Sequence, residues 1–321
     1  METELMKSKV DTFSTQLEPS EITYPDPEWS STYVNYFKDA EHPPPDSLNS
    51  SLSEHEIRQA RRSDDSPHIA RTPVHIRNIR GFEAEFSLEK QGFKISHLKS
   101  SMQNWRNNDE FKQVYLPEIA ELLKNELGAT HVFSYEYHIR TGTLEEALKM
   151  DSQGKVDIDG PVRRVHIDES PASGRNEFNY HMQPSINDHL KGRQFGIYNV
   201  WKPLKTIRKD PLCLCDTRTL RDEDLQSGKV TVPKVGEIEN FAIRPPTDKD
   251  RHAFVYLREQ QPSEVYLFRI FDTRLDGGLD GSDVVEDGKR SHGVAHTSFI
   301  DPGTECQAPR ESVEVRSFCI F

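Results

Sequence analysis

The chain has 321 residues, enough for one large domain or two ordinary ones around a buried core. Its 53 acidic residues outnumber 41 basic ones, which argues against a nucleic-acid partner because phosphate binding requires a concentrated basic surface. Four cysteines in a chain of this length do not form a disulfide framework, and no run of about 18 apolar residues occurs. We therefore expect a cytoplasmic protein with no membrane partner.

The N-terminal segment, residues 1–75, is rich in proline, serine and charge and lacks a sustained hydrophobic period. This composition predicts an extended or partly ordered arm. Aromatic residues between Tyr24 and Phe37 argue against complete disorder, and an arm of this kind can wrap the body or contact a second subunit. We expect residues 76–321 to form a single domain, in a monomer or a homodimer.

The body contains one clear predicted helix, followed by several short predicted strands. Apolar residues recur at three- and four-residue steps over 111–127, and Gly128 supplies a stop signal. Aromatic and β-branched residues predict a strand over 131–140. Further strands are predicted at 163–167, 194–201, 254–257, 265–271 and 312–320, and a polar loop at 275–293. The pattern predicts a β-rich α+β body, a barrel or sandwich with helices outside.

The sequence Val-His-Ile-Asp at 165–168 lies at the end of a predicted strand. Residues two apart on a strand point to one face, so His166 and Asp168 can converge on one metal ion. They supply two ligands of a two-histidine, one-carboxylate triad, which leaves positions open on iron(II) for a co-substrate and dioxygen. A solvent-facing pair on a strand is the alternative interpretation.

A later histidine is needed to complete such a triad. His296 lies 130 residues beyond His166 and precedes the Arg-Glu-Ser sequence at 310–312. Arg310 offers a bidentate fork for the far carboxylate of a keto acid, and Ser312 lies on the same strand face. Arg316 shares that face and is a rival anchor. A structural histidine and a surface ion pair are the alternatives for His296 and Arg310.

Other candidates rest on weaker signals. His252 is the second choice of ligand in place of His296, because no Arg-x-Ser sequence follows it at a comparable distance. Asn199, Trp201 and Tyr256 are candidate pocket residues, because polar and aromatic groups on the strands of a small barrel face the ligand or the core. Core packing is the alternative for Trp201.

The body resembles the fungal AsaB-like hydroxylase/desaturase family, whose relatives include the fungal gibberellin desaturase and proteins related to the cephem methoxylase. The resemblance covers roughly residues 80–320. It rests most on Asn-Val-Trp-Lys-Pro-Leu at 199–204 and Pro-Arg-Glu-Ser-Val-Glu-Val-Arg at 309–316, together with the His-x-Asp sequence and the segment beginning at His296.

That resemblance implies a double-stranded β-helix, a jelly-roll or cupin-like core with flanking helices. It also implies iron(II) and 2-oxoglutarate as cofactors, with dioxygen as co-substrate, and hydroxylation, desaturation or oxidative cyclisation of a small molecule in secondary metabolism. Two other functions fit the residues alone: a redox-neutral metal-dependent hydrolase or isomerase, and a non-catalytic β-protein that binds a small molecule.

Overall fold

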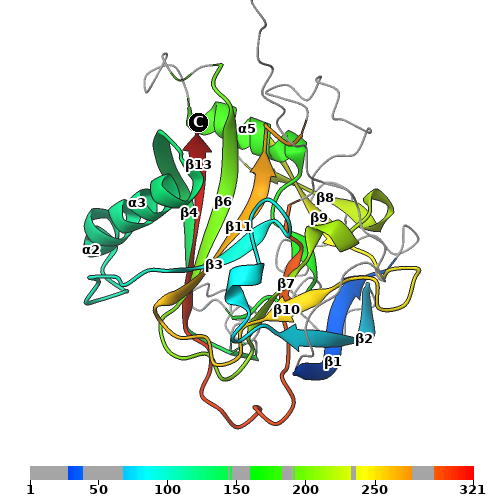
Figure 1. Cartoon of the computed structure of the whole chain (residues 1–321). Helices are drawn as coiled ribbons and strands as arrows, with labels where there is room; N and C mark the ends of the chain where they lie inside the picture. The colour runs from blue at the N-terminus through cyan, green and yellow to red at the C-terminus, as the bar shows by residue number, and fades with distance from the viewer. Residues whose placement is uncertain are drawn as a thin grey trace, which may run out of the picture.

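The computed structural model describes residues 28–38, 68–143, 145–146, 160–182, 190, 192–232, 236–276 and 293–321. These residues form two β-sheets that lie against each other, with helices along the outside of one sheet (Figure 1). None of the helices in these ranges is long and apolar enough to cross a membrane.

The larger sheet has eight strands in the order β1-β2-β10-β7-β12-β5-β9-β8. All neighbours in it are antiparallel except β10 and β2. In that spatial order the strands are Trp29–Phe37, Ile69–Asn78, Phe254–Tyr256, Leu212–Cys215, His296–Ser298, His166–Ile167, Gly236–Ile243 and Leu225–Val232.

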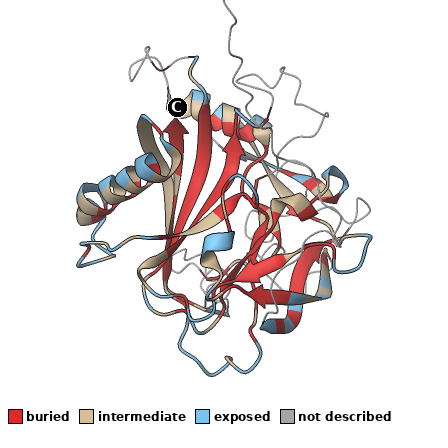
Figure 2. Cartoon of the chain, viewed as in Figure 1, coloured by how far each residue is buried: buried red, intermediate tan, exposed pale blue. Residues whose placement is uncertain are grey.

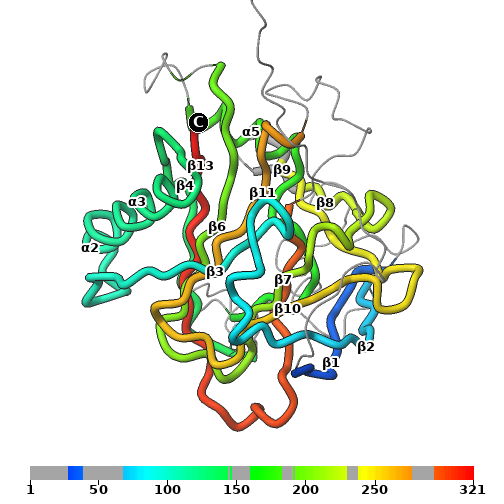
Figure 3. Tube along the Cα trace, viewed as in Figure 1, coloured from blue at the N-terminus to red at the C-terminus, as the bar shows by residue number. Residues whose placement is uncertain are grey.

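The smaller sheet has five antiparallel strands in the order β3-β11-β6-β13-β4. They run over Phe93–His97, Glu264–Asp272, Phe195–Pro203, Ser312–Ile320 and His131–Arg140. Four of these, all but β3, match strands predicted from composition and alternation. The tube view shows β13 running between β6 and β4 to the C-terminus (Figure 3).

The predicted helix at 111–127 is confirmed, with an irregular start. Three helical elements follow one another without a break: α2 (Asn108–Glu110), a π-helical turn η3 (Phe111–Tyr115) and α3 (Leu116–Leu127). Gly128 ends α3 with a φ of 69°, a left-handed conformation that glycine adopts without a Cβ clash. The second helix, α5 (Pro171–His181), begins where the Ser170 side chain accepts a hydrogen bond from the backbone N–H of Ser173.

Three short 3₁₀ turns complete the described elements. They are η2 (Glu83–Glu85), η5 (Thr217–Thr219) and η6 (Asp222–Asp224). The last of these carries a buried carboxylate, Asp224, at its end.

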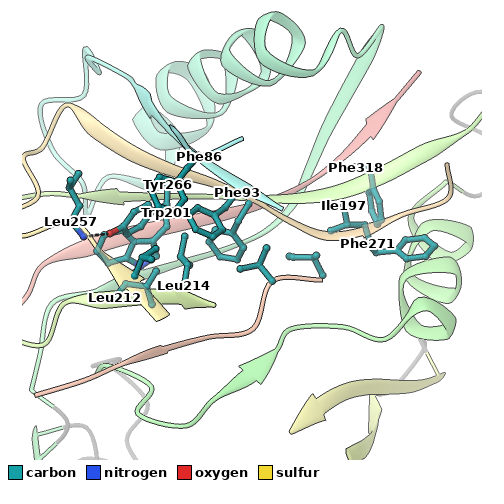
Figure 4. Packing of buried hydrophobic residues seen from close by; sticks show 14 of the residues in the cluster. Phe86, Phe93, Ile197, Trp201, Leu212, Leu214, Leu257, Tyr266, Phe271 and Phe318 are labelled. Carbon is teal, nitrogen blue, oxygen red and sulfur yellow. Dashed lines mark hydrogen bonds between the residues drawn. The ribbon is translucent and has the colours of Figure 1, made fainter. Parts of the chain in front are cut away.

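The core has three main parts, one on each side of the smaller sheet and one on the larger. Between the sheets, Trp201 and Phe93 pack with Leu212 and Leu214 (Figure 4). On the far face of the smaller sheet, Val313 and Val315 pack beneath α3 with Ile119, Leu123 and others. The central strands β6, β11 and β13 are therefore almost wholly buried, whereas β4 is only partly buried and β1 alternates buried with exposed residues (Figure 2).

Two expectations about organisation remain predictions. The described parts of residues 1–75 include β1 and most of β2, which belong to the larger sheet, and the rest of that segment lies outside the described residues. Most of the polar loop predicted at 275–293 also lies outside them. The boundary between an arm and a single domain at residue 75 is thus untested.

Candidate metal centre

Two histidines face each other across neighbouring strands of the larger sheet. His296 on β12 is the direct cross-strand partner of His166 on β5, and their ring centroids are 4.4 Å apart. Asp168 follows β5 immediately, and its Oδ1 lies 3.4 Å from Nε2 of His166 and 3.7 Å from Nε2 of His296. One ligand atom from each residue lies within 4.8 Å of the others. The structure therefore brings the three predicted ligands together in a group that can hold a metal ion.

Both imidazole rings are oriented by backbone carbonyls. The Nδ1 atom of His166 donates to the carbonyl of Arg164 at 2.8 Å, and that of His296 donates to the carbonyl of Val294 at 3.0 Å. A carbonyl only accepts, so Nδ1 carries the proton and Nε2 points its lone pair at the group. Burial lowers the pKa of His296 to about 4, so this ring is neutral at pH 7.

The smaller sheet supports the carboxylate of Asp168. Arg316 on β13 donates from Nη2 to Oδ1 of Asp168 at 2.9 Å and also contacts Glu136 on β4. Its cross-strand partner on β6, Asn199, places Nδ2 3.5 Å from Oδ2 of Asp168. Burial alone opposes ionisation of Asp168, but Arg316 and His296 hold its pKa well below the usual range. The carboxylate is therefore an anion, as a metal ligand must be.

A small cavity of about 30 Å³ adjoins these three residues between the sheets. Arg310 reaches it from the chain before β13, with its guanidinium carbon 5.4 Å from the centre of the Trp201 ring. Besides the three candidate ligands, it is lined by Arg140, Val162, Trp201, Leu212, Arg310, Glu314 and Arg316. Arg310 and Arg316, predicted to share a face, both line the cavity together with Glu314, whereas Ser312 does not line it and Val313 and Val315 face the helix.

The two rival arginines have different partners. Arg316 is committed to carboxylates, whereas Arg310 makes no ion pair within the described part of the chain. Arg310 is 4% exposed, and its Nη1 donates to the carbonyl of Asp210 at 2.8 Å and to Oγ of Ser298 at 3.2 Å. Burial lowers its pKa to about 10, so it remains a cation at neutral pH.

Buried donors near Arg310 are left without partners. Its own Nε and the hydroxyl of Ser312, two residues further on, have no hydrogen-bond partner among the described residues. An unpaired buried donor is costly, and an acceptor on a bound molecule can satisfy it. The chemistry of these groups, a cation with free N–H and O–H donors, suits a carboxylate.

Two predicted site residues lie elsewhere. His252, the second choice of ligand, accepts a hydrogen bond from the Tyr36 hydroxyl (2.9 Å) and lies 3.1 Å from Asp224. Tyr256 packs edge-on against Phe299, with 5.1 Å between ring centroids. Neither of them lines the cavity beside the three candidate ligands.

Sequence reasoning missed several polar residues of the site. Arg140 on β4 donates to Glu314 at 2.8 Å, which pairs two charges beside the cavity. Glu169 directly follows Asp168, is buried, and accepts a hydrogen bond from the Tyr135 hydroxyl. Burial raises the pKa of Glu169 to about 7. The position of Glu169 next to the His-x-Asp sequence was the only local signal for any of them.

The fold matches that of solved enzyme structures. A structure of the iron and alpha-ketoglutarate-dependent endoperoxidase NvfI matches with a TM-score of 0.68 at 21% identity, covering 91% of this chain and 98% of that one. A second structure of NvfI, in a different conformation, matches with a TM-score of 0.67. This likeness confirms the predicted jelly-roll core.

Sequence comparisons define the family. A family model described as an oxidoreductase/YMDC permease-like domain matches residues 34–320. An alpha-ketoglutarate-dependent dioxygenase, phiK from Fungal sp. (strain ATCC 74256), is 32% identical over 74% of this chain and 80% of its own length. The hydroxylase/desaturase efuI of Hormonema carpetanum is 29% identical over 89% of this chain and 92% of its own length. The gibberellin cluster GA4 desaturase of Gibberella fujikuroi is 27% identical over 76% and 85%.

The chain therefore belongs to the family of fungal alpha-ketoglutarate-dependent dioxygenases and hydroxylase/desaturases. The predicted resemblance is confirmed, and so is the predicted class, an alpha-ketoglutarate-dependent oxidoreductase. These comparisons concern whole chains and assign no role to a single residue.

Proposed function

We propose that this protein oxidises a small molecule at an iron(II) ion held by Nε2 of His166, the carboxylate of Asp168 and Nε2 of His296. The observation that carries the proposal is the convergence of these three groups within 4.8 Å, with both Nδ1 atoms already bonded to the backbone. Two histidines and one carboxylate leave coordination positions open on iron(II). When bound with 2-oxoglutarate, the ion supplies the oxidation of an unactivated C–H bond by dioxygen.

Arg310 is our proposed anchor for the far carboxylate of 2-oxoglutarate, with Ser312 as a further donor. Both carry buried N–H or O–H groups without a partner, and Arg310 has no competing carboxylate. The role of Arg316 is to hold Asp168 in place through its 2.9 Å hydrogen bond. The present cavity of about 30 Å³ holds about two waters, so it must widen to admit a five-carbon dicarboxylate.

The other two predicted pocket residues near the metal centre, Trp201 and Asn199, position neighbouring groups and do not take part in the reaction. Trp201 forms a wall of the cavity and also belongs to the core between the sheets, so both interpretations of this residue hold. Asn199 keeps Oδ1 without a partner while its Nδ2 faces Asp168. Hydroxylation, desaturation and oxidative cyclisation differ in how the substrate is placed, and product analysis by mass spectrometry distinguishes them.

A redox-neutral hydrolase or isomerase would use the same three ligands on zinc. It would have no use for a buried cation that makes no ion pair among the described residues, so the environment of Arg310 favours the oxygenase. A non-catalytic binding protein would have no use for two imidazoles with their Nε2 atoms turned toward one carboxylate.

The test is spectroscopic and is done without oxygen. Iron(II) and 2-oxoglutarate are added to the purified protein, and the visible charge-transfer absorption of a chelated keto acid is recorded. We expect the absorption to form in the natural protein and to be lost in His166→Ala. In Arg310→Ala it should require about 100-fold more 2-oxoglutarate, because a buried charge-assisted contact is removed.

The matched control is Arg208→Ala, which removes an exposed arginine paired with Glu259 at 3.1 Å. It should leave the 2-oxoglutarate requirement unchanged. Bound iron without the absorption would favour the redox-neutral enzyme, and failure to bind iron would favour the binding protein.

We also propose a cytoplasmic location, which is supported by four cysteines that form no disulfide, three of them buried. A fluorescent fusion found in a secretory compartment would contradict it. The expectations of no nucleic-acid partner and of a monomer or homodimer stay predictions.

A further inference from the structure

A second cavity lies beside the candidate metal centre. It has a volume of about 390 Å³ and is bordered by the first turn of α5 and by strands β9 and β11. Its apolar wall includes Phe241, Ile270 and Phe271. This volume and this wall suit an organic molecule much larger than 2-oxoglutarate.

The cavity is adjacent to the strand that carries the His-x-Asp sequence. Phe241 on β9 is the cross-strand partner of Ile167, between His166 and Asp168. Glu169, the next residue, lines the cavity. The same wall includes Gly293, where a Cβ would lie 2.3 Å from the carbonyl oxygen of Ile270. Glu169 therefore connects this cavity to the metal centre, because the residue before it along the chain is Asp168.

The charged groups of the lining are all acidic. Four carboxylates border the cavity, and no Lys, Arg or His does so among the described residues. Two of the four have named partners. Asp276 forms an ion pair with Arg175 at 3.1 Å, and Glu239 accepts a hydrogen bond from the Ser227 hydroxyl. Among the described lining residues, an anionic group entering this cavity would therefore meet carboxylates and no unpaired cation.

Glu169 differs from the engaged carboxylates. It is 4% exposed, and its Oε1 accepts from the Tyr135 hydroxyl, but its Oε2 has no hydrogen-bond partner among the described residues. A buried acceptor oxygen on the wall of a cavity can be satisfied by a donor on a bound molecule. The position of that oxygen fixes where the donor must lie.

We propose that this cavity is the substrate site, and that it selects a largely apolar molecule whose hydroxyl or amino group donates a hydrogen bond to Oε2 of Glu169. The inference rests on the proposed function, because it takes the adjacent metal centre as the reacting site. It assigns Glu169 as a residue that determines specificity and excludes substrates with a carboxylate at that end.

The test uses three probes that share one apolar cage: 1-adamantanemethanol, 1-adamantylmethylamine and 1-adamantanecarboxylate. Their dissociation constants are measured by calorimetry on the anaerobic protein loaded with iron(II) and 2-oxoglutarate, at about pH 8.5, where the carboxyl of Glu169, with a pKa of about 7, is ionised and only accepts. We expect the alcohol and the amine to bind at least about tenfold more tightly than the carboxylate, because only they can donate to Glu169. The ratio of alcohol to amine affinity identifies which donor the site prefers.

Two variants locate the binding. Glu169→Gln, whose amide can donate to a carboxylate, should reduce the discrimination against the carboxylate by about tenfold. Ala172→Trp, a change at an exposed position on the first turn of α5, should block the cavity and abolish binding of all three probes without unfolding the protein. Glu121→Gln, at an exposed glutamate of α3 that does not line the cavity, is the control and should change nothing.

The outcomes separate the two proposals. Equal binding of all three probes, or binding unaffected by Ala172→Trp, would overturn the assignment of this cavity even if the charge-transfer absorption forms. The expected probe pattern without that absorption would support the cavity and overturn the proposed function.

Discussion

Two buried clusters in this protein each combine histidine with carboxylate, and they have opposite character. In the candidate metal centre, each imidazole has its Nδ1 bonded to the backbone and its Nε2 open. In the second cluster, Nδ1 of His252 is occupied by the Tyr36 hydroxyl and Nε2 by Asp224. Asp224 is also bound by both terminal nitrogens of Arg251, at 2.6 and 2.7 Å.

The difference separates a proposed ligand histidine from a structural one. Both clusters contain a buried carboxylate, so the presence of a buried anion does not distinguish them. In the His252 cluster, both ring nitrogens of the histidine are hydrogen-bonded within the cluster. In the candidate metal centre, the Nε2 lone pairs of both histidines are directed at the Asp168 carboxylate. We interpret the His252 cluster as structural, and the predictions below test that contrast.

The largest expected effect is on iron binding. His166→Ala removes one of three proposed ligands, and iron(II) affinity should fall by more than ~100-fold, beyond the loss seen when only a supporting group is removed. His252→Ala should leave the affinity of the folded protein unchanged. Titration against a competing chelator under nitrogen measures both, and a comparable loss in His252→Ala would remove the contrast.

The next effect is on stability and should be confined to the second cluster. Asp224→Asn leaves the guanidinium of Arg251 buried without its anionic partner, so the free energy of unfolding should fall by about 3–5 kcal/mol. Asp248→Asn is the control, because this carboxylate is exposed and lies 3.6 Å from Nε of the same arginine. Its loss should cost less than about 1 kcal/mol in urea unfolding. Equal losses in the two variants would contradict the prediction.

A smaller effect is expected from pH. Burial lowers the pKa of His296 to about 4, below the value of about 6.5 in an unfolded chain. The unfolded state therefore binds more protons between these values, and the metal-free protein should lose stability as the pH falls through this window. Protonation of His296 in the unfolded chain should lower the free energy of unfolding by about 2 kcal/mol between pH 7 and pH 5. Urea unfolding of His296→Gln should show a pH slope reduced by that amount, and an unchanged slope would refute the assignment.

The smallest effect is expected for Tyr36→Phe. Burial raises the pKa of Tyr36, so its hydroxyl stays protonated and donates to His252. Removing this one hydrogen bond should lower the free energy of unfolding by about 1 kcal/mol and leave iron affinity unchanged. A thermal melt and the same chelator titration suffice, and weaker iron binding would link the two clusters.

Local patterns in the sequence were sufficient for much of the smaller sheet and its helix. The 3.6-residue period of 111–127 and the alternation along 312–320 are properties of short windows, and both elements form where expected. The shared face of Arg310, Glu314 and Arg316 follows from the same alternation. The His-x-Asp pair likewise required only the two-residue period of a strand.

The rest depends on contacts between distant segments. Strand β12 has three residues, too few to show a period, so the sequence favours His296 over His252 only through the Arg-Glu-Ser sequence that follows it. The pairing of β12 with β5 is what places His296 opposite His166. The hydrogen bond between the Tyr36 hydroxyl and His252 joins positions 216 residues apart. The hairpin β8–β9 was not predicted, because Gly228 and the charged residues Lys229, Glu237 and Glu239 interrupt its hydrophobic alternation.

The direct pairing of His166 with His296 also sets an order of events during biosynthesis. The proposed ligands come from strands separated by 130 residues, so a nascent chain has no complete site until β12 has left the ribosome and docked against β5. At the proposed site, iron loading therefore follows the synthesis and docking of β12. Because a ligand that binds only the folded state stabilises it, a cell short of iron would accumulate the less durable, metal-free form.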